Sequence, residues 1–443
     1  MLIETIDRSN NEQKCRVEID ENSHQNKLSN YRNLLSTNLD FHGQSTNYGS
    51  HSFHAFAAKF PPQIPRIFIE SLTRESDIIL DPMVGSGTTL VEAVSLGRYA
   101  IGVDLDPLAQ LICNIKTVKI SQSVAQKTLS DILDYVNFQI DREETKKWME
   151  NNFDIKTKEF IDYWFEKTTQ LELASLIFTI DKVVIDERMK KFFLGIFSSI
   201  IITKSGGVSK ARDLAHTRPH KDLSKKPKNA IQQFRIKADK SIKTFDIIEN
   251  TQGKAEVIPG DSRNIPLNDD SVDFIITSPP YANAIDYMRA HKFSLVWLGW
   301  PIESLTNLRS KYIGNEKLRD IKFKIPPFTD SWCIKIREKD VVKSKILVQY
   351  FTDMSLTISE MYRVLRSGSP AIIVIGPSTM RGIEIPTHLC LKEIGEEIGF
   401  QCIGIAERKL ERDKRMMPIA KNSNMNGIEN RLHREYILGF WKS

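Results

Sequence analysis

The sequence predicts an α/β fold built on a doubly wound, mostly parallel sheet with a helical insertion. A short apolar strand at residues 78–80 leads into a glycine-bearing turn and a helix at 88–96. A second apolar strand at 98–103 stops at Asp104. Beyond a long helical stretch, apolar strand-like runs return at 255–258, 272–276, 371–375 and 436–440. This alternation of strands and helices is typical of a doubly wound sheet.

Changes in composition divide the chain into four parts. Polar residues dominate the start, and helical periodicity without strands fills the middle, where Leu129 and Ile132 share one apolar face. The predicted parts are a flexible arm at 1–50, a first part of the catalytic domain at 51–117, a helical insertion at 118–250 and a second catalytic part at 251–443, with a loop-rich insert at about 305–345.

Composition and cysteine usage restrict the class of protein. The chain has 62 Lys and Arg against 56 Asp and Glu, a net charge of +6, which favours a polyanion only where the cations cluster. The first residues lack the pattern of a signal peptide, and no apolar run is long enough to span a bilayer. The five cysteines show no spacing typical of zinc or disulfides. We therefore expect a cytoplasmic protein without a metal site.

The glycine-bearing turn is the first motif that carries chemistry. It reads Asp81-Pro82-Met83-Val84-Gly85-Ser86-Gly87-Thr88-Thr89. Glycines let a ligand approach the backbone closely, and the following helix offers unpaired N–H groups. Nicotinamide enzymes use a similar turn, but the third glycine of their fingerprint is absent here. The turn predicts a cofactor site, and a tight turn without a ligand is the alternative.

Asp104 ends the second predicted strand, and an acidic residue there can accept hydrogen bonds from both hydroxyls of a ribose. The alternative role is a helix cap, because Asp106 and Pro107 follow and are typical of a helix start. Both roles can coexist if Asp104 binds the ribose and Asp106 caps the helix.

A second motif, Ser278-Pro279-Pro280-Tyr281, directly follows the strand at 272–276. Two prolines stiffen the loop and remove two N–H donors, so its carbonyls are available as acceptors. A hydroxyl and a carbonyl together can accept both protons of an amino group, and the tyrosine can stack on a base flipped out of a duplex. A plain rigid turn is the alternative.

These motifs, in this order, resemble those of the amino-methyltransferases of DNA restriction–modification systems. That family carries a D-P-F-x-G-S-G-T-T motif and a catalytic S/D/N-P-P-Y/F/W motif. Here Met83 replaces the usual Phe, and a long insertion separates Asp104 from Asp261. The resemblance runs from His51 to Trp441 outside the insertion. It implies a Rossmann-like class I methyltransferase fold with a seven-stranded sheet and S-adenosylmethionine as cofactor. It also implies double-stranded DNA as partner and allows a cognate restriction endonuclease as a second partner.

The resemblance also assigns residues to the two ends of the cofactor. The segment at 54–62 matches the part that holds the methionine end, Asp261 matches the acid that binds the adenine amine, and 287–293 matches a helix that completes the pocket. The predicted cofactor residues are Lys59, Phe60, Asp81, Pro82, Gly85, Ser86, Gly87, Thr88, Thr89, Asp104, Leu105, Asp261 and Ser262.

The first letter of the catalytic motif bears on the product. In the family, Ser usually accompanies cytosine-N4 enzymes, whereas Asp or Asn usually accompanies adenine-N6 enzymes. Ser278 therefore predicts a cytosine-N4 enzyme, with adenine-N6 as the nearest alternative. C5 methylation is disfavoured because no cysteine follows a proline. A non-catalytic DNA-binding protein, an RNA or protein amine methyltransferase and a nicotinamide dehydrogenase are more distant alternatives.

A basic loop in the helical insertion is the candidate DNA contact. Its cations are Lys204, Lys210, Arg212, Arg218, Lys221, Lys225, Lys226 and Lys228, and of these all but Lys221 are predicted DNA-binding residues. Glycines beside cations suit contacts with phosphates. A solvated surface loop is the alternative, and the stretch at 305–345 competes as the region that reads the target sequence.

Overall fold

The structure is a computed structural model that describes residues 21–59, 61–136, 142–203, 207–212, 214, 219–245, 251–282, 286–315, 325–410 and 434–443. Its strands are β1 (Ile78–Asp81), β2 (Tyr99–Asp104), β3 (Ala211–Arg212), β4 (His220–Lys221), β5 (Lys254–Pro259), β6 (Phe274–Thr277), β7 (Ser369–Ile375), β8 (Ser378–Met380), β9 (Ile383–Ile385), β10 (Gln401–Lys409) and β11 (Arg434–Lys442). The helices of its first half are α1 (Glu21–Leu35), η1 (Gly49–Ser52), α2 (Gln63–Leu72), α3 (Thr88–Ser95), α4 (Pro107–Thr117), α5 (Gln122–Asp134), α6 (Arg142–Asn152), α7 (Ile155–Trp164), α8 (Lys167–Val183), α9 (Glu187–Ile201) and α10 (Ala230–Ile242). The later helices are α12 (Met288–Leu295), α13 (Ile302–Arg309), α14 (Pro327–Arg337), α15 (Val341–Val364) and α16 (Thr387–Ile398).

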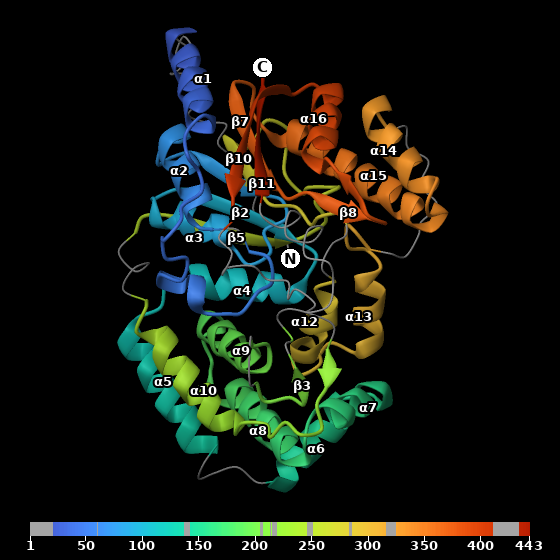
Figure 1. Cartoon of the computed structure of the whole chain (residues 1–443). Coiled ribbons are helices and arrows are strands. Elements are labelled where there is room, and N and C mark those ends of the chain that lie inside the picture. Colours follow the sequence, from blue (N-terminus) through green and yellow to red (C-terminus); the bar gives the residue numbers. More distant parts are fainter. Residues whose placement is uncertain are drawn as a thin grey trace.

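The main sheet has seven strands in the order β10-β11-β7-β6-β1-β2-β5. β11 runs antiparallel to both β7 and β10, and the other neighbouring pairs are parallel (Figure 1). The order reverses at β1, which is the switch point of a doubly wound sheet. The predicted doubly wound, mostly parallel seven-stranded sheet is confirmed. Of the strands of this main sheet, β10 was not predicted, because its apolar run is interrupted by Gly404 and ends in charged residues. The short strands β3, β4, β8 and β9 of the two small sheets were not predicted either.

The two faces of the sheet are covered by different helices, because successive strand residues point to opposite sides. Leu80, Ile275 and Ile373 belong to one core cluster together with residues of α15 and α16. Ile79 and Ile276 belong to another cluster, which includes residues of α1, α2 and α3. Figure 1 shows these two groups of helices on opposite sides of the sheet.

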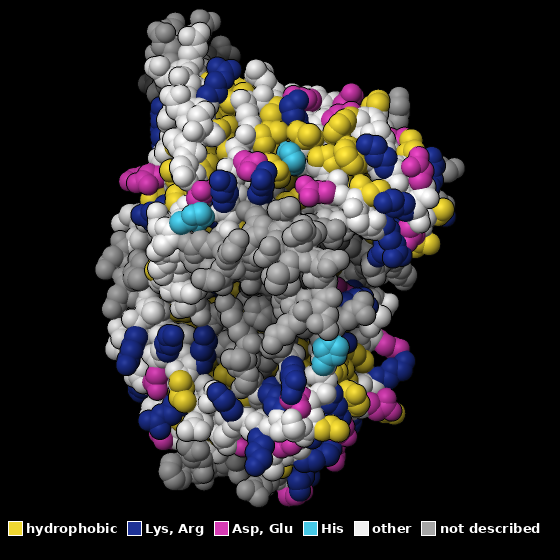
Figure 2. All heavy atoms as spheres, in the orientation of Figure 1, with side chains coloured by type: hydrophobic (Ala, Val, Ile, Leu, Met, Phe, Trp, Pro, Cys, Tyr) yellow, Lys and Arg dark blue, Asp and Glu magenta, His cyan; other side chains and the backbone are white. Residues whose placement is uncertain are grey.

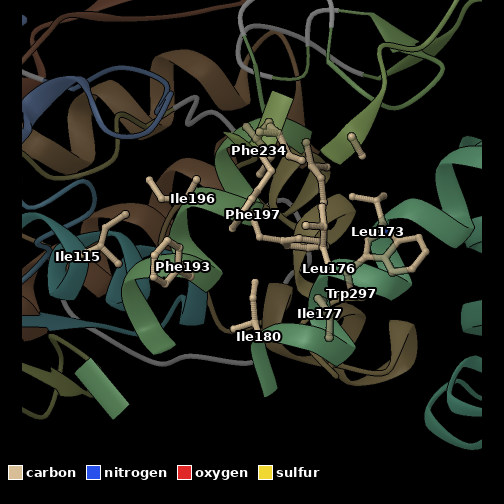
Figure 3. Packing of buried hydrophobic residues seen from close by; sticks show 14 of the residues in the cluster. Ile115, Leu173, Leu176, Ile177, Ile180, Phe193, Ile196, Phe197, Phe234 and Trp297 are labelled. Atoms are coloured by element: carbon tan, nitrogen blue, oxygen red, sulfur yellow. The ribbon is translucent and has the colours of Figure 1, made fainter. Parts of the chain in front are cut away.

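The helical stretch does not form a domain of its own. Helices α5 to α10, together with α12 and α13, make a lobe below the sheet in Figure 1, which we call the helical lobe. Its core is continuous with Ile115 of α4, as Figure 3 shows, and includes Trp297 from the segment after α12. At Gly195 of α9 a Cβ would lie 2.5 Å from the Ile115 Cδ1 atom, so only glycine permits this close helix packing. The predicted boundary at 118–250 therefore cuts through one core and leaves out α12 and α13.

Residues 21–50 do not form the expected flexible arm. Tyr31 and Leu35 of α1 are buried, and the Tyr31 hydroxyl donates to the Ala371 carbonyl of β7 at 3.0 Å. Leu35 packs directly on the backbone of Gly439 in β11, where a Cβ would lie too close to the Leu35 side chain. The polar composition misled the prediction because a few apolar residues, placed on one side of α1, suffice to attach the helix to the sheet. Residues 1–20 lie outside the described part of the chain.

The stretch at 305–345 is not the expected loop-rich insert in its described parts. It contains the end of α13, the whole of α14 and the start of α15. Pro327 stands at the start of α14, where a proline costs no hydrogen bond, so this proline marks a helix start and not a loop. Residues 316–324 lie outside the described part. No helix among the described residues is long and apolar enough to cross a membrane.

Candidate active site

A cavity of about 400 Å³ opens at the carboxyl ends of the parallel strands. β1, β2, β5 and β6 each end at its wall, which is where doubly wound sheets bind ligands. Most of the predicted cofactor and catalytic residues line it, namely Lys59, Pro82, Gly85, Ser86, Thr88, Asp104, Leu105, Asp261, Ser262, Ser278 and Pro280. Asp81, Gly87, Thr89, Pro279 and Tyr281 are not on its wall, and Phe60 lies outside the described residues. The fold thus gathers most of the predicted residues around one space.

Asp81 stabilises the glycine turn through hydrogen bonds without lining the cavity. The Asp81 carboxylate accepts hydrogen bonds from the Met83 N–H at 3.2 Å and from the Thr89 hydroxyl at 2.6 Å. Burial raises the pKa of Asp81 to about 6. Gly87, at φ 76°, faces α4, where a Cβ would lie 2.9 Å from the Cys113 Sγ atom. Asp81, Gly87 and Thr89 therefore shape the turn, while its other residues face the cavity.

Asp104 is half-buried at the end of β2 and contacts the turn directly. Its carboxylate accepts from the Gly85 N–H at 2.9 Å and from the Asp106 N–H at 2.8 Å. Burial, helped by the charge of Asp106, raises the pKa of Asp104 to about 7. Each carboxylate oxygen has a further lone pair, so a ligand hydroxyl at the cavity wall can still donate to it.

Asp106 has the structural role, since it caps α4 by accepting from the Leu108 N–H at 2.8 Å. Its other oxygen lies 2.6 Å from the His291 Nδ1 atom on α12. The contact with His291 lowers the pKa of Asp106 despite its burial. The pair therefore joins the helical lobe to the start of α4, beside Asp104.

Lys116 contacts the glycine turn from α4, and Lys59 lines the same cavity. Lys116 of α4 is fully buried and donates to the Ser86 carbonyl at 2.6 Å. Burial, and next the charge of Lys59, lower the pKa of Lys116 to about 7. Lys59 itself lines the cavity and donates to the His51 carbonyl at 2.9 Å. This side of the cavity suits a negatively charged group.

Asp261 follows β5, and its carboxylate is paired with a neighbouring arginine. The Arg263 guanidinium lies 2.6 Å from one Asp261 oxygen and bridges to the buried Asp353 at 2.8 Å. The pairing fixes the direction of the carboxylate at the cavity wall. Ser262, next to it, is buried and lies 3.2 Å from the Thr357 hydroxyl.

The Ser-Pro-Pro-Tyr motif forms the loop after β6. Ser278 and Pro280 face the cavity, whereas the Tyr281 hydroxyl donates to the Glu435 carboxylate of β11 at 3.1 Å. The next N–H, of Ala282, donates to the Ser378 hydroxyl of β8 at 3.2 Å. The first contact ties the loop to β11 of the main sheet, and the second ties it to the separate β8–β9 hairpin.

Several cavity residues escaped the sequence analysis. Phe56 and Tyr287 stack with ring centroids 5.2 Å apart and form an aromatic wall. Asp286 pairs with Arg289 and Arg309 at 2.9 Å and 2.5 Å on the rim. Other missed residues are Tyr312, Asn315, Lys343, Ile346, Thr379, Met380 and Arg381. The segments at 54–62 and 287–293 signalled the aromatic pair, but no local pattern marked the rest.

The predicted DNA contacts in the basic loop fall into two groups. Lys225 donates to the Ala211 carbonyl, Arg212 pairs with Asp222 at 2.6 Å, and Lys210 lies 3.4 Å from Glu166. Lys226 and Lys228 are exposed, whereas Lys204 and Arg218 lie outside the described residues. The first two of these contacts lie within the segment of the β3–β4 hairpin, and the third joins this segment to the residue before α8. Figure 2 shows many Lys and Arg side chains over the helical lobe on this side of the molecule.

Comparisons with known proteins give one consistent result. A family model described as DNA methylase, for N6 and N4 enzymes, matches residues 5–114. The type II methyltransferase M.MvaI of Kocuria varians is 26% identical over 91% of this chain and 93% of its own length. The type II methyltransferase M.AvaI of Nostoc sp. is 25% identical over 76% of each chain.

A solved Thermus thermophilus structure, a putative DNA modification methylase with S-adenosyl-L-methionine, is 17% identical over 41% of this chain and 53% of that chain. Its TM-score of 0.21 is too low for a comparison of the two folds. The family model covers the N-terminal quarter of the chain, and the M.MvaI relative aligns along almost the whole of it. These comparisons support the assignment of the chain to the family of DNA amino-methyltransferases of restriction–modification type.

Proposed function

We propose that this S-adenosylmethionine-dependent DNA methyltransferase acts on the exocyclic N4 amine of a cytosine that is flipped out of double-stranded DNA. The observation that carries the proposal is Ser278 on the cavity wall at the carboxyl end of β6. In the family, serine at this position usually accompanies cytosine-N4 enzymes. Its hydroxyl makes no hydrogen bond with another described residue, so it is available to a substrate.

The cavity has the groups that S-adenosylmethionine requires. Asp104 offers carboxylate oxygens to the ribose hydroxyls, and the glycine turn lets a ligand approach the backbone. Asp261 offers an acceptor for the adenine amine, and Lys59 a cation for the methionine carboxylate. The bound cofactor supplies a methyl group on a positively charged sulfur.

The residues of the chain contribute to the reaction by making the cytosine amine a better nucleophile. A cytosine amine is a poor nucleophile because its lone pair is delocalised into the ring. The Ser278 hydroxyl and the Pro279 carbonyl accept hydrogen bonds from its two N–H groups, which makes the nitrogen more pyramidal and directs the lone pair toward the methyl group. After the transfer the methylated amine releases one proton to water. Tyr281 is not itself on the cavity wall, but its neighbours Pro280 and Ala282 are, and its ring would support the flipped base by stacking, which contributes about 1–3 kcal/mol.

The product tests the proposal most directly. Unmethylated DNA is treated with the purified protein and cofactor, digested to nucleosides and analysed by mass spectrometry. We expect N4-methylcytosine. A Ser hydroxyl is neutral and shorter than a carboxylate, so it suits an amine that comes close to the backbone of the motif. N6-methyladenine as the only product would contradict the cytosine assignment, while the fold and the displacement mechanism would stand.

DNA affinity should fall with salt, and the exposed lysines of the basic loop should contribute to the slope. Replacing Lys226 and Lys228 by Gln should lower the log–log slope of affinity against salt by up to about 1.8, since each phosphate contact contributes about 0.9. The control replaces Lys127 of α5 and Lys243 after α10, which are equally exposed, and should leave the slope unchanged. Equal slopes for both variants would exclude the loop as a DNA contact.

A further inference from the structure

Residues that are distant in sequence fix the hydroxyl of Tyr281 through hydrogen bonds. Its hydroxyl donates to one oxygen of Glu435 at 3.1 Å, and the other oxygen of Glu435 accepts from the Arg408 guanidinium at 2.6 Å. Glu435 and Arg408 face each other across β10 and β11, with side chains only 13% and 4% exposed. Burial holds the pKa of Tyr281 well above its ordinary value, so the hydroxyl remains a donor at neutral pH.

The ring of Tyr281 is fixed at its edge as well as at its hydroxyl. A Cβ on Gly376, just after β7, would lie 2.6–2.8 Å from the Cε2, Cζ and hydroxyl atoms of Tyr281. The ring therefore rests directly on the Gly376 backbone. The residue as a whole is half-buried and lies between Pro280 and Ala282, which line the cavity.

Arg408 extends the support to the N-terminal segment. Its guanidinium donates to the Leu39 carbonyl at 3.2 Å and to the Asp40 carbonyl at 3.3 Å. Since the Arg408 side chain has fixed partners on both sides, Glu435 has little freedom to turn away from Tyr281. A carboxylate fixed in this way defines one position for the hydroxyl that donates to it.

We propose that Glu435 is a positioning residue for methyl transfer, because its carboxylate holds the Tyr281 hydroxyl and thereby sets the orientation of the ring before a base arrives. The proposal rests on the proposed function, in which the ring supports the flipped base. A ring that is already oriented has less conformational freedom to lose when it binds the base. The family motif also tolerates Phe and Trp at this position, so the hydroxyl anchor is a property of this chain and not a requirement of stacking itself.

The experiment is a double-mutant cycle with Tyr281→Phe and Glu435→Gln. Methylation of long unmethylated phage DNA gives kcat/KM for DNA, calorimetry gives cofactor affinity, and thermal unfolding monitors the fold. We expect each single variant to lower kcat/KM for DNA about tenfold, the usual weight of a hydrogen bond to a charged group. The double variant should be no worse than Tyr281→Phe, and cofactor affinity should stay at the wild-type value.

Tyr99→Phe is the matched control, because Tyr99 donates to Glu256 at 2.5 Å in another Tyr–Glu pair of the same sheet and does not line the cavity. It should leave kcat/KM unchanged. Gly376→Ala displaces the ring without altering the Glu435–Arg408 pair, and we expect it to lower kcat/KM at least as much as Tyr281→Phe. If Glu435→Gln does not fold, Gly376→Ala and Tyr281→Phe together still test the proposal.

Two results would overturn the positioning role. One is wild-type kcat/KM in Tyr281→Phe, and the other is an equal loss from Glu435→Gln with and without the Tyr281 hydroxyl, which would make the glutamate a purely structural residue. Nucleoside analysis of the wild-type reaction separates these results from a failure of the proposed function. If the wild-type protein methylates no base, both proposals fall; if it methylates DNA, only the positioning role is at stake.

Discussion

Replacing Ser278 by alanine should reduce the rate of methyl transfer by about 10²–10³-fold, the range for loss of one fixed polar contact to a reacting group. Ser278 lines the cavity at the end of β6, where the amine must approach the methyl group. Without its hydroxyl one N–H group of the amine has no hydrogen-bond acceptor. The nitrogen lone pair then remains more delocalised into the ring when the methyl group is transferred, which raises the barrier. The Pro279 carbonyl is unaffected, which leaves a residual rate. Single-turnover methylation at saturating cofactor measures the effect.

The control for this experiment is Ser262→Ala. Ser262 lies on the same cavity but follows β5, next to Asp261, the predicted adenine-binding acid. It should change cofactor affinity at most, and leave the single-turnover rate at saturating cofactor near wild type. Cofactor affinity of Ser278→Ala should be close to normal in calorimetry. Full turnover by Ser278→Ala would refute the role of the hydroxyl.

The second large effect is expected at Asp104. Asp104→Ala removes a charged acceptor for the ribose, and also the partner of the Gly85 N–H at 2.9 Å. A hydrogen bond to a charged group contributes about 1.5–3 kcal/mol, so cofactor affinity should weaken about 10- to 150-fold. Calorimetry with cofactor alone measures this without any DNA. Wild-type affinity would exclude Asp104 from ribose binding and leave it only a structural role at the turn.

The pH dependence of cofactor binding gives an independent check. Burial and Asp106 raise the pKa of Asp104 to about 7 in the protein without ligand, so the carboxyl takes up a proton as the pH falls through that value. The ionised form is the stronger acceptor for a hydroxyl. Affinity should therefore be full above about pH 8 and fall up to tenfold for each pH unit below about pH 7. Asp104→Asn cannot titrate, and its weaker binding should lack this component.

Local patterns in the sequence determined the parts of the site that lie within one strand–loop–helix unit. The glycine turn, Asp104 at the end of β2 and Ser278 after β6 all follow directly from the end of a strand, and parallel strands bring such ends to one edge. The order of these units in the chain was sufficient to predict the doubly wound sheet. The polar composition of residues 21–50 was not sufficient, since α1 packs on the sheet through few apolar side chains.

Tertiary structure decided which residues complete the site, because these contacts join segments that carry no mutual signal in the chain. Tyr281 and Glu435 are 154 residues apart, and their meeting depends on β11 lying beside β7. The cavity rim likewise takes Arg309 from α13 and Arg381 from the β8–β9 hairpin, both outside any motif. The helical lobe joins α5–α10 with α12 and α13 around one core. A residue's neighbours along the chain specify its secondary structure, whereas the side chains it meets across the core are set by how whole elements pack.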